Sequence, residues 1–181
     1  MNKGDSSLGI YDLDSYEINK STCAVINLKE DISKVIEKNN EYLLPKRSLQ
    51  VMEDSCSYYG SSYNGRLKGT KKILGSNYKL PIIIEESNDL VFFPTTGLNN
   101  EDCSWISLNN IESYEQYRGY TKVTFIDGKT LIVKMSYSSF ELQLMRATRL
   151  SNLVKKEQRE NKNLSLKMYK NVINACFSLN L

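Results

Sequence analysis

Histidine is absent from this chain of 181 residues. Its absence excludes serine-histidine and cysteine-histidine catalytic pairs, and it also excludes histidine as a metal ligand. The four cysteines are dispersed, with no Cys-x-x-Cys pair, which favours neither a zinc site nor a disulfide framework. Lysine-assisted or carboxylate chemistry stays open in principle, but no carboxylate pair or phosphate-loop motif indicates it. We therefore expect free, partly buried thiols, no metal, no cofactor and no enzymatic activity.

Long apolar runs are missing as well. The longest, such as residues 80–84, are far shorter than the roughly 20 residues that a membrane-spanning helix needs. The first residues contain no apolar signal-peptide core. We therefore expect a cytoplasmic protein without a membrane partner, in a compartment that keeps its thiols reduced.

The overall composition is that of an ordinary globular protein. Hydrophobic residues make up 40% and charged residues 25% of the chain, which is long enough for one domain with tails. The net charge of +3 is only mildly basic. Bulk charge therefore identifies no partner, and the distribution of charge along the chain has to be considered.

Short β-type stretches flank a helical region, which predicts an α+β fold with antiparallel sheets. Two short helices are expected within residues 48–74, near 49–59 and 62–74, and a longer helix near 138–160. The expected strands lie at residues 15–18, 22–28, 32–37, 41–44, 81–85, 90–93, 104–107, 111–117, 120–126 and 129–135.

Several residues predict where these elements begin and end. Ser48 is the expected N-cap of the first helix, and Gly75 is the expected stop of the second. Asp127-Gly128 between two β-rich runs predicts a tight hairpin in which both turn residues take positive φ. Ser138 and Glu141 have the spacing of a capping box, which predicts the start of the long helix.

A run of unopposed cations lies in the second short helix and just beyond it. Between Ser55 and Lys79 there are five basic residues and no acidic one, so the rest of the chain is slightly acidic. At 100° per residue, one arc of the helix is apolar and the neighbouring arc is cationic. The apolar arc holds Tyr63, Leu67, Thr70 and Leu74, and the cationic arc holds Lys68, Lys71 and Lys72.

Small residues border the cationic arc. Gly65 and Gly69 weaken the helix by about 1 kcal/mol each relative to alanine, but they leave a surface that a phosphate backbone can approach closely. Ser61, Ser62 and the helix N-terminus supply hydroxyl and N–H donors that suit phosphate oxygens. By itself this stretch favours anion or nucleic-acid binding, although an ordinary solvated helix face is an equally good interpretation of the composition.

Several motifs, in matching order, resemble the ComK family of competence transcription factors. The longest is Ser55–Arg66, which Gly69-Thr70 follows. Together the motifs cover about residues 15–150. The others are Ile36–Lys38, Leu49-Gln50, Lys79–Ile82, Phe92–Thr95, Cys103–Ser107, Val123–Phe125, Gly128–Thr130 and Ser136–Glu141.

The resemblance implies a non-enzymatic activator of DNA-uptake genes. Members of this family bind paired A-tract and T-tract boxes as dimers that associate into tetramers, approach from the minor groove, tolerate or promote bending, and act with RNA polymerase. Applied to this chain, it implies a flexible segment at residues 1–13, a DNA-binding domain at 14–160 and a tail at 161–181 for oligomerisation or protease recognition. The DNA-binding residues expected from the motif and its cations are Ser61, Ser62, Tyr63, Asn64, Arg66, Lys68, Lys71, Lys72 and Lys79. Arg66 is expected in the minor groove, and the lysines and serines are expected on phosphates.

Family members are also degraded through an adaptor that delivers them to a Clp protease. The corresponding family segment reads Phe-Met-Leu-Tyr-Pro, and the nearest match here keeps only its Met and Tyr. The implied adaptor contacts are Leu166, Met168 and Tyr169. A second hypothesis stays open, in which the chain is a degenerate ComK-like protein-interaction module without specific DNA binding.

Overall fold

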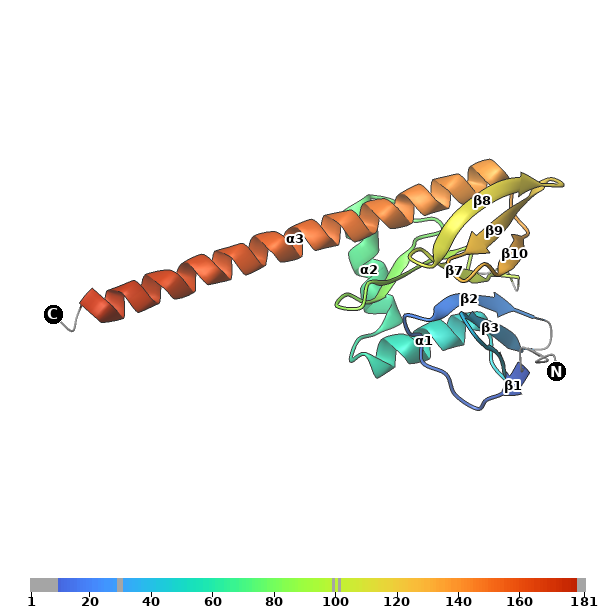
Figure 1. The fold of residues 1–181 in the computed structure, drawn as a ribbon, viewed down its shortest axis with the longest axis horizontal. Coiled ribbons are helices and arrows are strands. Elements are labelled where there is room, and N and C mark those ends of the chain that lie inside the picture. Colours follow the sequence, from blue (N-terminus) through green and yellow to red (C-terminus); the bar gives the residue numbers. More distant parts are fainter. Residues whose placement is uncertain (1–9, 29–30, 99, 101, 179–181) are drawn as a thin grey trace, which may run out of the picture.

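The computed structural model describes residues 10–28, 31–98, 100 and 102–178 (Figure 1). Within these residues, ten strands and three helices form an α+β fold, which confirms the expected class. The strands are β1 (Ile10–Asp12), β2 (Thr22–Asn27), β3 (Ser33–Glu37), β4 (Glu41–Leu44), β5 (Ile82–Glu85), β6 (Leu90–Pro94), β7 (Trp105–Ser107), β8 (Ile111–Tyr117), β9 (Tyr120–Phe125) and β10 (Thr130–Val133). The helices are α1 (Ser48–Tyr58), α2 (Tyr63–Leu74) and α3 (Tyr137–Ser178).

The strands form two sheets. A seven-stranded sheet has the order β1-β4-β3-β2-β7-β6-β5, and a three-stranded sheet has the order β10-β9-β8. All pairings are antiparallel except that of the edge strand β1, which runs parallel to β4. Of the segment expected to be flexible, residues 1–9 lie outside the described residues, and residues 10–12 form this strand.

Residues on the two faces of the large sheet belong to two separate cores, because neighbouring strand residues point to opposite sides. Phe92 packs in one core with residues of α1, and Phe93 packs in the other with the small sheet and α3. The same alternation separates Ile82 from Ile83. The large sheet is therefore the middle layer of three, between α1 and the small sheet with α3. Helix α2 lies beside the edge strand β5 and contacts both cores, the first through Tyr63 and the second through Ile73 and Leu74.

The strand expected at residues 15–18 is not formed. Tyr16 is buried, and its hydroxyl donates to Glu37 Oε1 over 2.5 Å. The backbone N–H of Ile18 donates to Ser55 Oγ over 3.1 Å. Side chains satisfy the polar groups of this segment, and both residues pack against the core without pairing to a neighbouring strand.

Two of the expected caps are wrong, because other side chains take their place: a distant residue caps α1, and the residue directly before α3 caps that helix. Ser48 is the first residue of α1 itself, and the side chain of Asn27 caps that helix by accepting the Ser48 N–H over 2.8 Å. The long helix begins at Tyr137, and Ser136 Oγ accepts the N–H of Ser139 over 3.3 Å. Local sequence motifs therefore placed both helix starts within two residues but assigned the wrong caps.

The hairpin at Asp127-Gly128 is present, but its turn differs from the expected one. Only Gly128 has a positive φ, of 83°, and Phe125 N–H bonds to Lys129 O across a three-residue loop. This is a turn followed by one left-handed residue, the next commonest hairpin connection. The two-residue turn with two positive φ angles joins β8 to β9, at Arg118 and Gly119.

The cysteines Cys23, Cys56 and Cys103 are free and buried, which confirms the expectation for these three; the side chain of Cys176 lies outside the described set. Burial raises the pKa of Cys56 to about 11. The thiols therefore stay protonated at neutral pH and behave as small hydrophobic residues.

Helix α3 is much longer than the expected 138–160. Its first part packs on the sheets through Phe140, Ala147 and Leu150, and the rest projects away from the globular part (Figure 1). No glycine or proline interrupts residues 137–178, so the sequence contains no signal that ends the helix. In the described part of the chain, no helix combines the length and the apolar character needed to cross a membrane.

Candidate nucleic-acid interface

Helix α2 is fixed at both ends and along one side. Ser62 Oγ accepts the N–H of Gly65 over 3.1 Å at the first turn, and Gly75 ends the helix in the left-handed region with φ of 64°. Tyr63 is only 6% exposed and packs edge to face against Trp105, with ring centroids 6.2 Å apart. The expected DNA contact at Tyr63 is therefore not available at the surface, and this residue supports α2 from the core side.

The cationic arc of α2 faces solvent. Lys68, Lys71 and Lys72 are all exposed, and none of their side chains forms an ion pair or hydrogen bond with another described residue. No acidic residue occurs in α2. These three ammonium groups lie on a capped helix and pair with no carboxylate of the described chain, so a phosphate can bind them without displacing an ion-pair partner. We call Lys68, Lys71 and Lys72 the lysine face.

Arg66 differs from these lysines, because it already has partners. Its Nη1 donates to Glu86 Oε1 over 2.6 Å, and its Nε donates to Ser61 Oγ over 3.0 Å. Glu86 belongs to the β5–β6 turn, and its second oxygen accepts from Gln158 of α3. Since 40% of the Glu86 side chain is exposed, this ion pair is open to competition from a phosphate or a base edge.

Gly65 and Gly69 line a groove of about 320 Å³ between α2 and α3. Leu150 and Val154 of α3 form part of its other wall, and Arg66 also lines it. The side of α2 that the glycines leave bare therefore faces the groove next to the lysine face. The groove therefore provides the open space beside the two glycines that the sequence predicts for close approach of a phosphate backbone.

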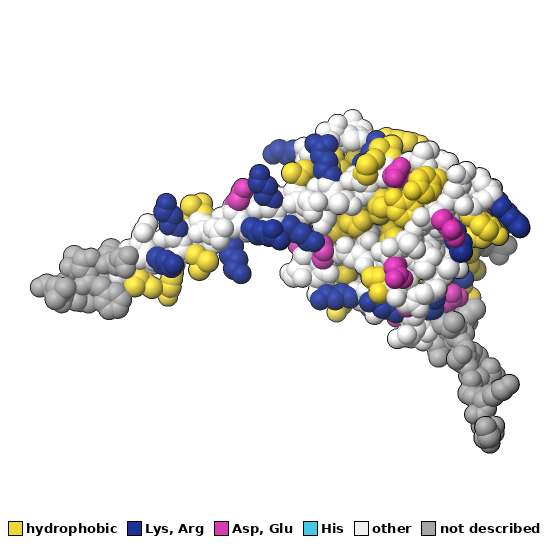
Figure 2. All heavy atoms as spheres, turned by 45° about the horizontal axis from the view of Figure 1, so that its top comes forward, with side chains coloured by type: hydrophobic (Ala, Val, Ile, Leu, Met, Phe, Trp, Pro, Cys, Tyr) yellow, Lys and Arg dark blue, Asp and Glu magenta, His cyan; other side chains and the backbone are white. Residues whose placement is uncertain are grey.

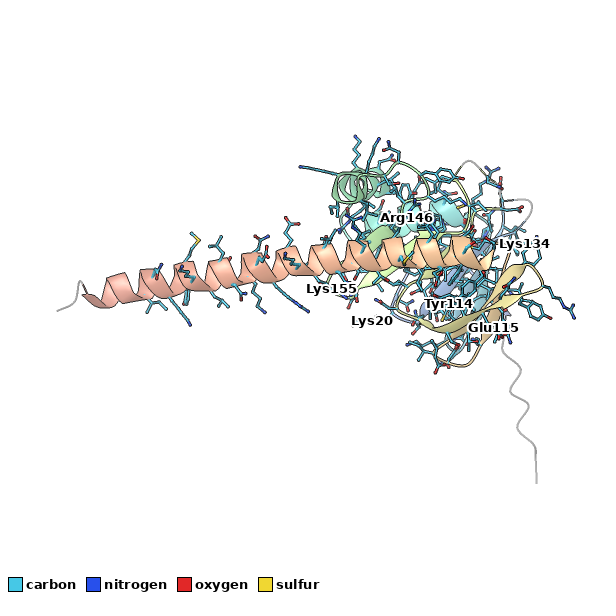
Figure 3. All side chains as sticks on the ribbon, turned by 90° about the horizontal axis from the view of Figure 1, so that it is seen from above. Lys20, Tyr114, Glu115, Lys134, Arg146 and Lys155 are labelled. Carbon is cyan, nitrogen blue, oxygen red and sulfur yellow. The ribbon has the colours of Figure 1, made fainter. Side chains whose placement is uncertain are left out.

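The loop after α2 is anchored to α3. Gln143 Nε2 donates to the carbonyl oxygens of Lys79 and Pro94, each over 3.0 Å, and Arg146 donates to the carbonyl of Tyr78 over 3.3 Å (Figure 3, where Arg146 is labelled). Lys79 has φ of 49°, and its ammonium group lies 5.4 Å from the centre of the Tyr78 ring. Lys79, the fifth basic residue between Ser55 and Lys79, is thus held in the loop that directly follows α2.

The remaining expected contacts lie at the N-terminal end of α2. Ser61 and Ser62 accept hydrogen bonds from Arg66 and Gly65, and each hydroxyl keeps its own O–H for an external acceptor. Asn64 is exposed on the first turn. The structure therefore places all the expected DNA-binding residues except Tyr63 at the surface of α2 or of the loops at its ends. At 100° per residue, however, Arg66 lies at least 120° around the helix from each member of the lysine face, on the side toward Glu86 and α3.

Sequence reasoning missed three residues that shape this surface. They are Tyr78, in the loop after α2, and Glu86 and Gln143, which come from other elements. Long-range contacts of single polar residues leave no periodic signal in a sequence. No group of three metal-ligating residues occurs in the described part of the chain.

The two glycines of α2 give a paired test of this geometry. A Cβ at position 69 meets nothing within 4 Å, so Gly69→Ala stabilises the protein by about 0.5–1 kcal/mol through helix propensity. A Cβ at position 65 lies 2.8 Å from Ser62 Oγ and disturbs the cap, so Gly65→Ala gives no such gain. Urea unfolding of both variants measures the difference, and equal stabilisation by both would contradict it.

The segment implied to bind an adaptor lies on the projecting part of α3. Leu166, Met168 and Tyr169 are each more than half exposed and contact no other element of the described chain. These side chains are accessible, and they are separate from the surface around α2 (Figure 2 shows hydrophobic side chains on the projecting helix in yellow).

Comparison with known proteins gives two matches. Residues 13–159 match the family described as ComK protein. The competence transcription factor of Bacillus subtilis (strain 168) is 38% identical over 138 residues, which are 74% of this chain and 72% of that protein. No solved structure matches the chain significantly.

Proposed function

Because the chain belongs to the ComK family, we propose that it is a DNA-binding activator of competence genes that binds AT-rich promoter boxes through α2. The observation that supports this most is the lysine face, which is exposed, lies on a helix without acidic residues and forms no ion pair among the described residues. A polyanion is the partner that best matches three unpaired ammonium groups on one rigid helix.

The preference for AT-rich DNA follows from the shape of the duplex. A-tracts have a narrow minor groove with a strong negative potential, which attracts an inserted arginine. Arg66 is the arginine of α2, and it reaches the groove when the duplex displaces Glu86. The lysine face, Lys79 and the Ser61 and Ser62 hydroxyls then hold phosphates. With about five phosphates neutralised, log K falls with log salt at a slope near −4 to −5 per subunit.

Two substitutions separate groove reading from phosphate binding. Arg66→Ala lowers affinity for AT-rich duplex and reduces the preference over GC-rich duplex, because it removes the groove contact. Lys72→Ala weakens binding to both duplexes equally and lowers the salt slope by about one. Fluorescence anisotropy titrations on the two duplexes measure both effects, and unchanged binding by both folded variants would remove the proposed interface.

Glu86→Gln tests whether the Arg66 ion pair competes with DNA. The amide no longer neutralises Arg66, so binding of AT-rich duplex tightens and the salt slope becomes steeper by about one. Glu53→Gln is a matched control, because Glu53 is an exposed carboxylate on α1 without a recorded ion pair. Weaker DNA binding by Glu86→Gln would instead assign Glu86 to holding Arg66 in its binding position.

A second role is favoured by the accessible residues Leu166, Met168 and Tyr169. We propose that they bind an adaptor of a Clp protease, as the family resemblance implies. The remaining partners in this proposal are RNA polymerase and a second copy of the chain, and the site of action is the cytoplasmic nucleoid. Replacing the three residues with serine slows adaptor-dependent degradation without changing DNA affinity, and an unchanged half-life would contradict this role.

A further inference from the structure

The side of α3 that does not pack on the sheets carries a stripe with an unusual order of residues. Seven residues on this side of the helix lie within about 40° of one line parallel to the helix axis, over a length of about 33 Å. We call this set the α3 stripe. In chain order it consists of Leu142, Arg146, Arg149, Leu153, Glu157, Glu160 and Leu164.

The α3 stripe is symmetric about its central leucine. A leucine stands eleven residues before Leu153 and another stands eleven residues after it. The two arginines lie seven and four residues before Leu153, and the two glutamates lie four and seven residues after it. If the helix is turned end to end about Leu153, each leucine of the stripe therefore takes the position of a leucine, and each arginine takes the position of a glutamate.

The leucines of the α3 stripe are open to solvent, although leucines are usually buried. Leu142 is 45%, Leu153 39% and Leu164 59% exposed. The buried residues of α3, such as Phe140 and Ala147, lie on another side of the helix, against the sheets. Figure 2 shows hydrophobic, basic and acidic side chains on this outer part of α3. The domain thus leaves the stripe without a partner.

The charges of the α3 stripe are also mostly unused within the chain. Arg149 and Glu157 are exposed and have no recorded ion pair with a described residue. Glu160 has only a 3.8 Å contact with Lys156, and both side chains are about two-thirds exposed or more, so that pair contributes little. Arg146 bonds to the carbonyl of Tyr78 and keeps donors free.

We infer that α3 pairs antiparallel with α3 of a second copy of this chain, through the α3 stripe and with the two-fold axis at Leu153. In that arrangement Leu153 meets the partner's Leu153, and Leu142 meets the partner's Leu164. Arg149 faces the partner's Glu157, and Arg146 faces the partner's Glu160. A two-fold interface requires such a self-complementary surface.

The pairing also accounts for the projecting part of α3. A solitary helix in water gains little from propensity, and most helical stability comes from packing. Antiparallel pairing about Leu153 places residues 158–169 beside residues 137–148 of the partner's α3. This stretch of α3, whose side chains beyond Gln158 form no hydrogen bond or ion pair with another element in the described part of the chain, thereby obtains a packing surface.

Charge reversal on the full-length chain, without DNA, tests this pairing. Arg149→Glu alone places glutamate opposite glutamate twice, and Glu157→Arg alone places arginine opposite arginine twice. Each variant alone raises the dimer dissociation constant at least about tenfold. An equimolar mixture of the two variants restores both opposite-charge pairs, and its dissociation constant returns to within about threefold of wild type.

Sedimentation velocity over about a hundredfold range of concentration measures self-association. Arg159→Glu, an exposed change of the same charge outside the α3 stripe, leaves it unchanged. As a second measurement, Leu153→Cys in a Cys176→Ser background forms a disulfide between two chains, and Met145→Cys, which lies off the stripe, does not. Far-UV circular dichroism verifies that each variant folds.

Three results would overturn the inference. They are a wild-type chain that stays monomeric, single variants that associate as tightly as wild type, and a mixture that associates no better than its components. None of these results depends on the surface around α2, because the assay contains no DNA. Conversely, a chain that dimerises through α3 but ignores AT-rich duplex would refute only the proposed function.

Discussion

Replacing Lys68, Lys71 and Lys72 together with alanine is expected to lower affinity for AT-rich duplex about a hundredfold at physiological salt. Each lysine that neutralises a phosphate releases about one counterion, so the salt slope also decreases by about three. The fold is unaffected, because all three side chains are exposed and make no recorded contact with other described residues. Anisotropy titrations at four or more salt concentrations give both quantities.

A control with the same change in net charge separates local contact from bulk electrostatics. Lys20, Lys134 and Lys162 are exposed, have no recorded ion pair and lie outside α2 (Figure 3 labels Lys20 and Lys134). Their joint replacement with alanine changes DNA affinity less than about threefold, because distant surface charges are screened by salt. Equal losses for the two triple variants would mean that binding follows total charge and involves no particular helix.

Removing the Phe140 ring is expected to cost about 3–5 kcal/mol of unfolding free energy. Phe140 is fully buried, and its ring centroid lies 5.4 Å from that of Phe93 in β6 and 5.1 Å from that of Tyr114 in β8. It therefore joins α3 to both sheets at one point. Phe140→Ala loses this packing and leaves a cavity, which urea unfolding detects as a lower midpoint.

Met145 on the same helix is the matched control for Phe140. Its side chain is 57% exposed, so Met145→Ala changes stability by less than about 0.5 kcal/mol. Similar losses for the two variants would mean that α3 is not held to the sheets by the Phe140 cluster. Loss of α3 packing also loosens the loop at Tyr78–Lys79, which Gln143 and Arg146 hold, so Phe140→Ala weakens DNA binding as well.

The short helices were predictable because their signals are local. The apolar period of α2 and its terminal residue Gly75 are contained in thirteen consecutive residues, 63–75. The full length of the long helix was harder to predict, because residues 155–163 are charged and lack an apolar face that would predict packing. Only the absence of glycine and proline indicated that the helix continues.

The candidate site could be predicted in part for the same reason. The cations follow helical spacing, so their common exposure on α2 was readable from sequence. The ion pair of Arg66 with Glu86 was not, since it joins residues from different elements and depends on how the β5–β6 turn meets α2. Burial of Tyr63 against Trp105 was likewise decided by tertiary packing.

The most direct measurement of the central claim is photo-crosslinking from the lysine face to bound DNA. Lys71→Cys and Lys134→Cys, each in a Cys176→Ser background, carry a benzophenone group, because Cys23, Cys56 and Cys103 are buried and protonated at neutral pH. The account predicts a strong crosslink to AT-rich duplex from position 71 and none above background from position 134. A bound complex that crosslinks from position 134 but not from position 71 would contradict it.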